Sequence, residues 1–174
     1  TLLNKGYEVI EAHVLFGAPY SKIETVIQPQ SIVHSLVEFK DGAIIAQMGT
    51  PTMEVPVRLA LTYPDRLPSA VKPLNFKNAF SLEFEPLKAK NYPLFALALD
   101  AAKEGGTLPC ALNAADEVAV KAFLDGKISF TEIFSVVDSV LAVTPRDEAV
   151  SFKQLAEVDR AARWRAQKLI FKMR

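Results

Sequence analysis

Four prolines, at positions 64, 68, 73 and 86, interrupt residues 64–91, and they constrain the fold of this 174-residue chain more than any other feature. Proline lacks a backbone N–H and disfavours helical geometry in the residue before it, so no long helix can cross this segment. We therefore predict an extended connector, with one strand at residues 80–85 ("FSLEFE"), and a domain boundary between the parts on either side.

The chain before the connector is predicted to begin with a helix. Apolar residues at helical spacing indicate a helix over residues 4–16, which Asn4 is expected to cap and Gly17 to end.

A hairpin and a short helix are expected next. Residues 31–49 are rich in β-branched and apolar types around Asp41-Gly42, a pair typical of a hairpin turn. A short helix should then run from near Pro56 up to Pro64.

The chain after the connector is predicted to be helical. Ser129 and Glu132 have the spacing of a capping box, and Asp159 is a second candidate N-cap at which the last helix could break. The expected helices, joined by short loops as in a small bundle, are 92–106, 107–126, 130–143 and 152–173. The fold class is therefore α+β: a mixed α/β part with a small sheet, followed by a mostly α-helical bundle.

Composition excludes several classes of protein. Twenty basic residues balance twenty acidic ones, which argues against a nucleic-acid surface but allows a local site for a small anion. The single Cys110 excludes an internal disulfide and a cysteine zinc cluster, and it fits a reducing cytosol. No apolar run of roughly 18 residues predicts a membrane span. The start, "TLLNKGYEV", lacks the pattern of a signal peptide, and we expect the chain to be cut from something longer.

The first predicted helix carries Asn4, Lys5 and Glu8 on one turn, with Glu11 one turn further on. A helix N-terminus with an amide and an ammonium suits a phosphate monoester, and a carboxylate suits Mg²⁺ or Mn²⁺. One glutamate is not a metal site, so other oxygen ligands would have to come from elsewhere. The alternative is ordinary helix capping, since a glutamate near an N-terminus is favourable in any case.

Four segments resemble one enzyme family. "LNKGYEVIEAHVLFG" is similar to the "MNKGLE-IEA-WLFG" motif of 1-deoxy-D-xylulose 5-phosphate reductoisomerases, and "PQSIVHSLVEFKDGAIIAQMGTPTM" is similar to their "HPQS-IHS-V-Y-DGS-LAQLG-PDM". "LTYPDRL" followed by "PLNF" resembles the family's connector. "ALNAADEVAVKAFLDGKISFTEI" resembles "LNAANE-AV-AFL-G-I-F-DI". The motifs run in order along nearly the whole chain.

The resemblance implies an NADPH-dependent enzyme that rearranges and reduces a sugar phosphate and needs Mg²⁺ or Mn²⁺, with Co²⁺ as a further candidate. Residues 1–63 would be the second half of its catalytic domain, 64–88 a linker and 89–174 the C-terminal helical bundle. The NADPH domain would lie upstream, so this chain alone should be inactive. The family implies a homodimer, no nucleic-acid or membrane partner, and a bacterial cytoplasm, plastid stroma or apicoplast.

The resemblance also assigns roles to residues. Asn4 and Lys5 match the phosphate-binding pair, and Glu8 matches one of three metal-binding carboxylates, which makes Lys5 and Glu8 the catalytic candidates. Ser31, His34 and Met53 match substrate-side positions, and Met53 also matches a nicotinamide contact. From the residues alone, Ser31 could equally be a strand-end cap, His34 a satisfied histidine in a sheet, and Met53 a core filler.

Other residues leave alternatives open. Asn113 and Glu117 could line a pocket or satisfy buried polar groups between helices. His13 is expected to be partly exposed, and Trp164 and Phe171 to lie in the bundle core or at an interface. Departures from the family motifs stand at three positions: Gln28 for His, Thr52 for Asp and Asp116 for Asn.

Two other function classes compete with the enzyme fragment. One is a free-standing, non-catalytic helical module that binds or supports a partner. The other is a related enzyme acting on a different phosphorylated substrate. Asn4, Lys5 and Glu8 argue against the pure binding module, because a neutral scaffold needs neither the cation nor the metal-type ligand.

Overall fold

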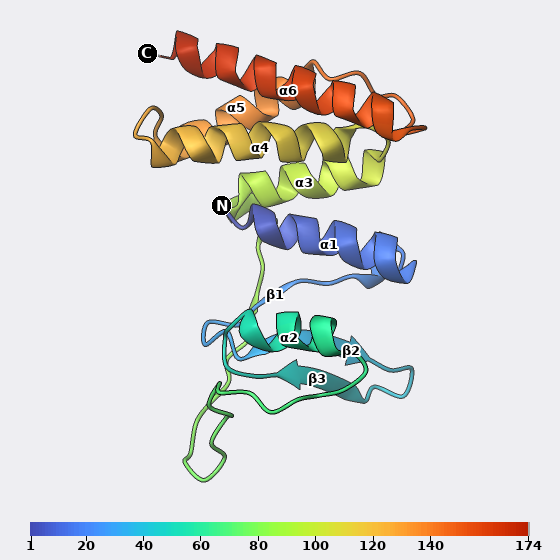
Figure 1. The fold of residues 1–174 in the computed structure, drawn as a ribbon, viewed down its shortest axis with the longest axis vertical. Coiled ribbons are helices and arrows are strands. Elements are labelled where there is room, and N and C mark those ends of the chain that lie inside the picture. The colour runs from blue at the N-terminus through green and yellow to red at the C-terminus, as the bar shows by residue number, and fades with distance from the viewer. Residues whose placement is uncertain (174) are drawn as a thin grey trace. The chain divides into compact units, whose positions relative to one another are not determined.

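The computed structural model describes residues 1–173 and has an α+β fold, as predicted (Figure 1). The chain forms two compact units. Unit 1 combines Thr1–Glu24 with Lys88–Arg174, and unit 2 is Thr25–Leu87. No helix within the described residues is long and apolar enough to cross a membrane.

Unit 1 is a stack of helices. Helix α1 packs on α3, α3 packs on α4, and α4 lies against both α5 and α6 (Figure 1). Two short 3₁₀ helices, η1 and η2, accompany them. The bounds are α1 Leu3–Phe16, η1 Tyr20–Lys22, η2 Ala89–Asn91, α3 Pro93–Glu104, α4 Leu108–Leu124, α5 Phe130–Ala142 and α6 Phe152–Lys172.

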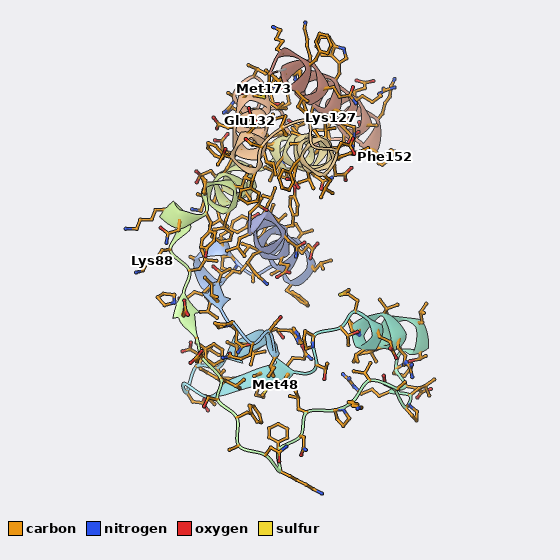
Figure 2. The ribbon with its side chains drawn as sticks, turned by 90° about the vertical axis from the view of Figure 1, so that its left-hand side faces the viewer. Met48, Lys88, Lys127, Glu132, Phe152 and Met173 are labelled. Atoms are coloured by element: carbon orange, nitrogen blue, oxygen red, sulfur yellow. The ribbon has the colours of Figure 1, made fainter. Side chains whose placement is uncertain are left out.

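Helix α4 is the centre of the core. Its inward positions are mostly alanines, which allow α5 and α6 to approach closely, while larger apolar side chains from α5 fill the remaining space. Figure 2 shows the side chains of these helices as sticks. The fully buried residues include Ala111, Ala114, Ala115, Ala119, Ile133, Val136, Val137 and Val140. Unit 1 therefore has one continuous apolar core, against which α1 is packed.

The helix ends confirm some predictions and correct others. The capping box of Ser129 and Glu132 opens α5, and Gly17 ends α1 in the left-handed conformation, with φ 66°. Asn4 is not the cap of α1, because the helix begins one residue earlier and the Asn4 side chain bonds elsewhere. Asp159 does not break α6, because its carboxylate accepts a hydrogen bond from Arg163 within a continuous helix.

Unit 2 holds two small antiparallel sheets and one helix. Strands β2 (Val33–Glu38) and β3 (Ile44–Met48) form the predicted hairpin, whose turn places Gly42 at φ 84°. Strand β1 (Val26–Ile27) pairs with β4 (Glu85–Pro86). The predicted strand at 80–85 is therefore reduced to its last residue and the one that follows.

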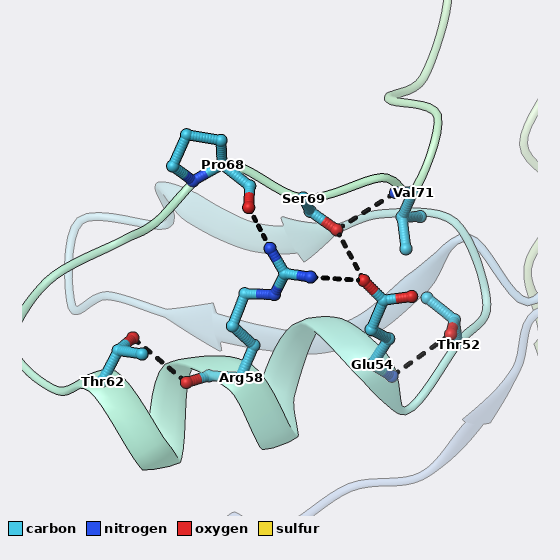
Figure 3. A network of polar contacts seen from close by, with 7 residues as sticks. All are labelled: Thr52, Glu54, Arg58, Thr62, Pro68, Ser69 and Val71. Carbon is cyan, nitrogen blue, oxygen red and sulfur yellow. Dashed lines mark hydrogen bonds and ion pairs between the residues drawn. The ribbon is translucent and has the colours of Figure 1, made fainter.

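Helix α2 is Glu54–Thr62, so Pro56 lies in its first turn rather than at its start. A cluster of side chains ties α2 to the chain that follows it (Figure 3). The Arg58 guanidinium donates to Glu54 at 2.8 Å and to the Pro68 carbonyl, and the Ser69 hydroxyl donates to Glu54 at 3.1 Å. Part of the proline-rich connector is thus held against the helix.

The compact units do not follow the division expected at residues 63 and 88. Helix α1 belongs with the bundle because its apolar stripe of Leu3, Gly6 and Val9 is buried, and Gly6 lies directly against α3. The connector belongs with the hairpin because β1 and β4 pair. A proline-rich composition predicts an irregular backbone, and it does not predict which unit that backbone joins.

Candidate functional site

Asn4, Lys5 and Glu8 converge on one turn of α1. The Glu8 carboxylate accepts a hydrogen bond from Asn4 Nδ2 at 2.9 Å through one oxygen and an ion pair from Lys5 Nζ through the other. The Glu8 side chain is 44% exposed and that of Lys5 is 35% exposed, so both polar heads can reach a ligand from solvent. The spacing of the three residues therefore produces the cluster that the sequence predicted.

The geometry of α1 explains this exposure. Burial of Leu3, Gly6 and Val9 against the bundle turns Asn4 and Glu8, four residues apart, to the outer face. An exposed ion pair of this kind contributes little to stability, about 0.5 kcal/mol. Breaking the contacts between Lys5 and Glu8 therefore costs little free energy when a charged ligand competes for either side chain.

The donor set fits part of a metal site. Among residues 1–173, no group of three His, Cys, Asp or Glu side chains is placed to hold a metal ion. Glu8 offers one hard carboxylate ligand, which suits Mg²⁺ or Mn²⁺. The described chain can therefore supply one ligand of such a site.

The loop before β2 carries Ser31 and is shaped by Gln28. The Gln28 side-chain oxygen accepts from the backbone N–H groups of Ile32 at 2.7 Å and Val33 at 3.3 Å. Ser31 adopts φ 52°, a conformation rare outside glycine, and is exposed. The Gln28 amide nitrogen also donates to the Gln30 side chain, so the residue uses both its acceptor and its donor without a protonatable ring.

His34 lies at an irregularity of the hairpin. Val33 pairs with Met48 and Ser35 with Gln47, so His34 is an extra residue on β2. A bulge of this kind redirects a side chain, and bulges are frequent beside active sites. His34 is exposed on β2, so its ring is accessible rather than buried in the sheet.

Met53 immediately precedes α2 and is 72% exposed, so it is not a core filler. Beside it, the Thr52 hydroxyl accepts a hydrogen bond from the Glu54 N–H at 3.2 Å (Figure 3). The Thr52 hydroxyl thus accepts a local hydrogen bond two residues along the chain, which an aspartate could also accept. Ser31, His34 and Met53 belong to unit 2, whereas Asn4, Lys5 and Glu8 belong to unit 1.

One contact near the α1 cluster was missed by the sequence analysis. The Tyr7 hydroxyl donates to Asp116 Oδ2 on α4 at 3.4 Å. Burial raises the pKa of Asp116 to about 6, while the hydrogen bond from Tyr7 opposes this rise and the nearby Glu117 adds to it. Burial, together with the charge of Asp116, raises the pKa of Tyr7, so the phenol stays protonated. No local pattern links two residues so far apart in sequence.

The remaining candidates lie on the surface of unit 1. Asn113 donates to Glu117 at 3.1 Å, and Arg163 of α6 donates to the other Glu117 oxygen at 2.7 Å. Glu117 therefore bridges α4 and α6 at an exposed position, so the expectation that the pair satisfies buried polar groups between helices is not met. Trp164 and Phe171 are 59% and 78% exposed, so neither lies in the bundle core.

His13 is partly exposed as expected. Its Nδ1 lies 2.8 Å from the carbonyl of Ala18, and its ring stacks on Tyr20. These contacts give it a structural role at the end of α1.

Comparison with known proteins identifies the family. The model of the DXP reductoisomerase C-terminal domain matches residues 48–165, more than half of the chain. The 1-deoxy-D-xylulose 5-phosphate reductoisomerase of Cupriavidus pinatubonensis is 48% identical over 167 residues, which are 96% of this chain and 42% of that protein. That of Pelotomaculum thermopropionicum is 51% identical over 164 residues, which are 94% of this chain and 42% of that protein.

Solved structures with a similar fold belong to the same family. The Zymomonas mobilis 1-deoxy-D-xylulose 5-phosphate reductoisomerase in complex with NADPH has a TM-score of 0.88 at 38% identity, covering 97% of this chain and 45% of that one. The structure of DOX-P reductoisomerase in complex with NADPH, fosmidomycin and magnesium has a TM-score of 0.87 at 37% identity. The match covers 99% of this chain and 44% of that one. The chain spans less than half the length of these relatives. By sequence and by fold, and as its motifs predicted, the chain belongs to the 1-deoxy-D-xylulose 5-phosphate reductoisomerase family.

Proposed function

We propose that this chain is part of an enzyme that converts 1-deoxy-D-xylulose 5-phosphate to 2-C-methyl-D-erythritol 4-phosphate with NADPH, a step of non-mevalonate isoprenoid biosynthesis. The observation that carries the proposal is the meeting of Asn4, Lys5 and Glu8 on one exposed turn, in a chain of this family. An anion-binding pair beside a hard carboxylate is what a phosphorylated, metal-dependent substrate requires.

Lys5 and Asn4 bind the phosphate group in this proposal. The ammonium supplies a compact charge and the amide supplies a neutral donor, both near the positive end of α1. Their grip on the far end of the substrate orients its reacting carbons, so binding energy away from the reacting bonds contributes to the rate.

Glu8 supplies one carboxylate to a divalent cation, and the other protein ligands come from the part of the enzyme upstream of this chain. Glu8 would there help to hold Mg²⁺ or Mn²⁺, which would supply Lewis-acid chemistry to the substrate carbonyl. In the structure, the Glu8 carboxylate accepts hydrogen bonds from Asn4 and Lys5. When the cation and the substrate bind, Asn4 and Lys5 would donate to the phosphate group instead of to Glu8.

Ser31, His34 and Met53 complete the substrate side. The exposed thioether of Met53 offers an apolar, polarizable contact to substrate and nicotinamide. The bulge at His34 and the left-handed backbone of Ser31 direct two polar groups out of unit 2. As the family implies, the upstream domain binds most of NADPH in this proposal.

The organisation of the whole enzyme follows the family. We propose that residues 1–63 complete the catalytic domain, 64–88 link it to the bundle and 89–174 form the C-terminal domain, notwithstanding the compact units of the isolated chain. We also propose a homodimer that works in the bacterial cytoplasm or in a plastid compartment.

The test is an activity assay on the full-length enzyme. Glu8→Gln keeps the size and the hydrogen-bond acceptor but removes the charge, so NADPH oxidation with 1-deoxy-D-xylulose 5-phosphate and Mn²⁺ should fall by about 100-fold or more. Glu11→Gln, the same change on the same helix, should leave the rate within about twofold. A wild-type enzyme without this activity would overturn the proposed function, and an active Glu8→Gln variant would remove Glu8 from it.

A further inference from the structure

Helix α1 is attached to the bundle by two kinds of contact. The first is the apolar stripe of Leu3, Gly6 and Val9, which is buried against the bundle. Burial of this stripe sets which face of α1 turns to the bundle, but apolar contacts are not directional, so they leave small rotations of α1 about its axis less strictly fixed. Because Lys5 and Glu8 lie on the same turn as this stripe, that rotation decides where their polar heads point.

The second contact is directional. Tyr7 lies between Lys5 and Glu8 in sequence, packs partly buried against the core, and donates its hydroxyl to Asp116 Oδ2 at 3.4 Å. Asp116 sits on α4, which packs against α3, α5 and α6, and its neighbours Ala114 and Ala115 are fully buried. The bond therefore joins the ligand-bearing turn to the central helix of the unit.

An aspartate at position 116 lowers the stability of the fold. Its Oδ1 atom is buried and has no hydrogen-bond partner among the described residues. A buried carboxylate oxygen without a partner destabilises a fold, and a residue that only filled space would be apolar. A role that needs a directed acceptor explains why this residue is tolerated. At 3.4 Å the contact is at the long end of the hydrogen-bond range, so a small rotation of α1 would change its strength.

We propose that the Tyr7–Asp116 hydrogen bond is a positioning pair that sets the rotation of α1 and thereby the orientation of Lys5 and Glu8 toward phosphate and metal. Both residues act through the α1 cluster, and neither touches the substrate. The inference rests on the proposed function, because it gives the pair a purpose only if Glu8 binds the cation.

The test measures Mn²⁺ binding to the full-length enzyme by electron paramagnetic resonance at pH 8, without turnover. Tyr7→Phe should weaken Mn²⁺ binding by about threefold to tenfold, the net effect of one typical hydrogen bond. Asp116→Ala should do the same, and Asp116→Asn, which keeps an acceptor oxygen, should recover most of the loss. The double variant Tyr7→Phe/Asp116→Ala should be no weaker than either single variant.

Controls separate the outcomes. Tyr20→Phe makes the same change near the other end of α1, where Tyr20 stacks on His13, and should leave Mn²⁺ binding unchanged. If Tyr7→Phe and Asp116→Ala lower the melting temperature but leave Mn²⁺ affinity at the wild-type value, the pair is structural only and the inference is overturned. If the wild-type enzyme itself binds no Mn²⁺, or if Glu8→Gln binds it normally, the metal role of Glu8 in the proposed function fails first, and the inference falls with it.

Discussion

Gly6→Ala should loosen α1 from the bundle, because the helices α1 and α3 touch at this residue. A Cβ atom at Gly6 would lie 2.6 Å from the Cβ of Ala98, which is fully buried on α3. Two carbon atoms pack best at about 3.5 to 4.0 Å, so the helices must separate by about 1 Å. Overpacking of this size costs about 1 to 3 kcal/mol, and the better helix propensity of alanine returns up to about 1 kcal/mol. The expected net loss is about 1 to 2 kcal/mol.

The assay is equilibrium unfolding in urea, with the full-length protein and a matched set of variants. Ala98→Gly removes the opposing methyl group, so the double variant Gly6→Ala/Ala98→Gly moves that methyl from one helix to the other. The double variant should recover at least about 1 kcal/mol relative to the sum of the single variants. Because Lys5 and Glu8 flank Gly6, Gly6→Ala should also raise KM for the substrate. Strict additivity of the two free-energy changes would refute the close contact between α1 and α3.

Three further predictions concern single side chains. Lys5→Ala should raise KM for 1-deoxy-D-xylulose 5-phosphate by about 10- to 100-fold, and an equal loss of binding with a dephosphorylated analogue would contradict its phosphate role. Gly106→Ala should destabilise the protein by about 3 kcal/mol in urea unfolding. The reason is that Gly106 has φ 58° and that a Cβ atom there would lie 2.2 Å from the Asp147 carbonyl oxygen. A loss below about 1 kcal/mol would contradict this close contact between Gly106 and Asp147. The pKa of Asp116 is raised from 3.8 to about 6, so the folded state binds the proton of this carboxyl group more tightly than the unfolded state does. The protonated group therefore stabilises the fold fully below pH 3.8, and this contribution is lost as the pH rises through about 6. Asp116→Asn should therefore be more stable than the wild type at pH 8, by about 1 to 2 kcal/mol after allowance for partial exposure, and the gain should vanish near pH 4; a gain independent of pH would contradict the raised pKa.

Local signals predicted much of the fold. The Ser129–Glu132 capping box, the αL glycine at residue 17 and the Asp41-Gly42 turn each act within a few residues, and all three appear as expected. The α1 cluster was likewise predictable, because residues three and four apart on a helix must be neighbours.

Competition between partners was not predictable. Asn4 has a side chain suited to capping, yet it bonds to Glu8, and Asp159 could open a helix, yet it bonds to Arg163. In both cases the partner lies four residues away on the same helix, and the capping pattern alone does not reveal that this contact replaces the cap.

Long-range pairing was invisible from the sequence alone. The Tyr7–Asp116 bond joins residues 109 positions apart, and the pairing of β1 with β4 draws the connector into unit 2. Ser31, His34 and Met53 have no shared spacing that would mark them as one site. Their assignment came from the family motifs, whereas that of Asn4, Lys5 and Glu8 also follows from chemistry.

Glu8 as a metal ligand is the central claim, and Mn²⁺ binding to the full-length enzyme tests it most directly. The wild-type protein should bind Mn²⁺, Glu8→Gln should weaken that binding by about 10- to 100-fold or abolish it, and Glu11→Gln should match the wild type. Equal Mn²⁺ affinity in the wild type and Glu8→Gln would contradict the account.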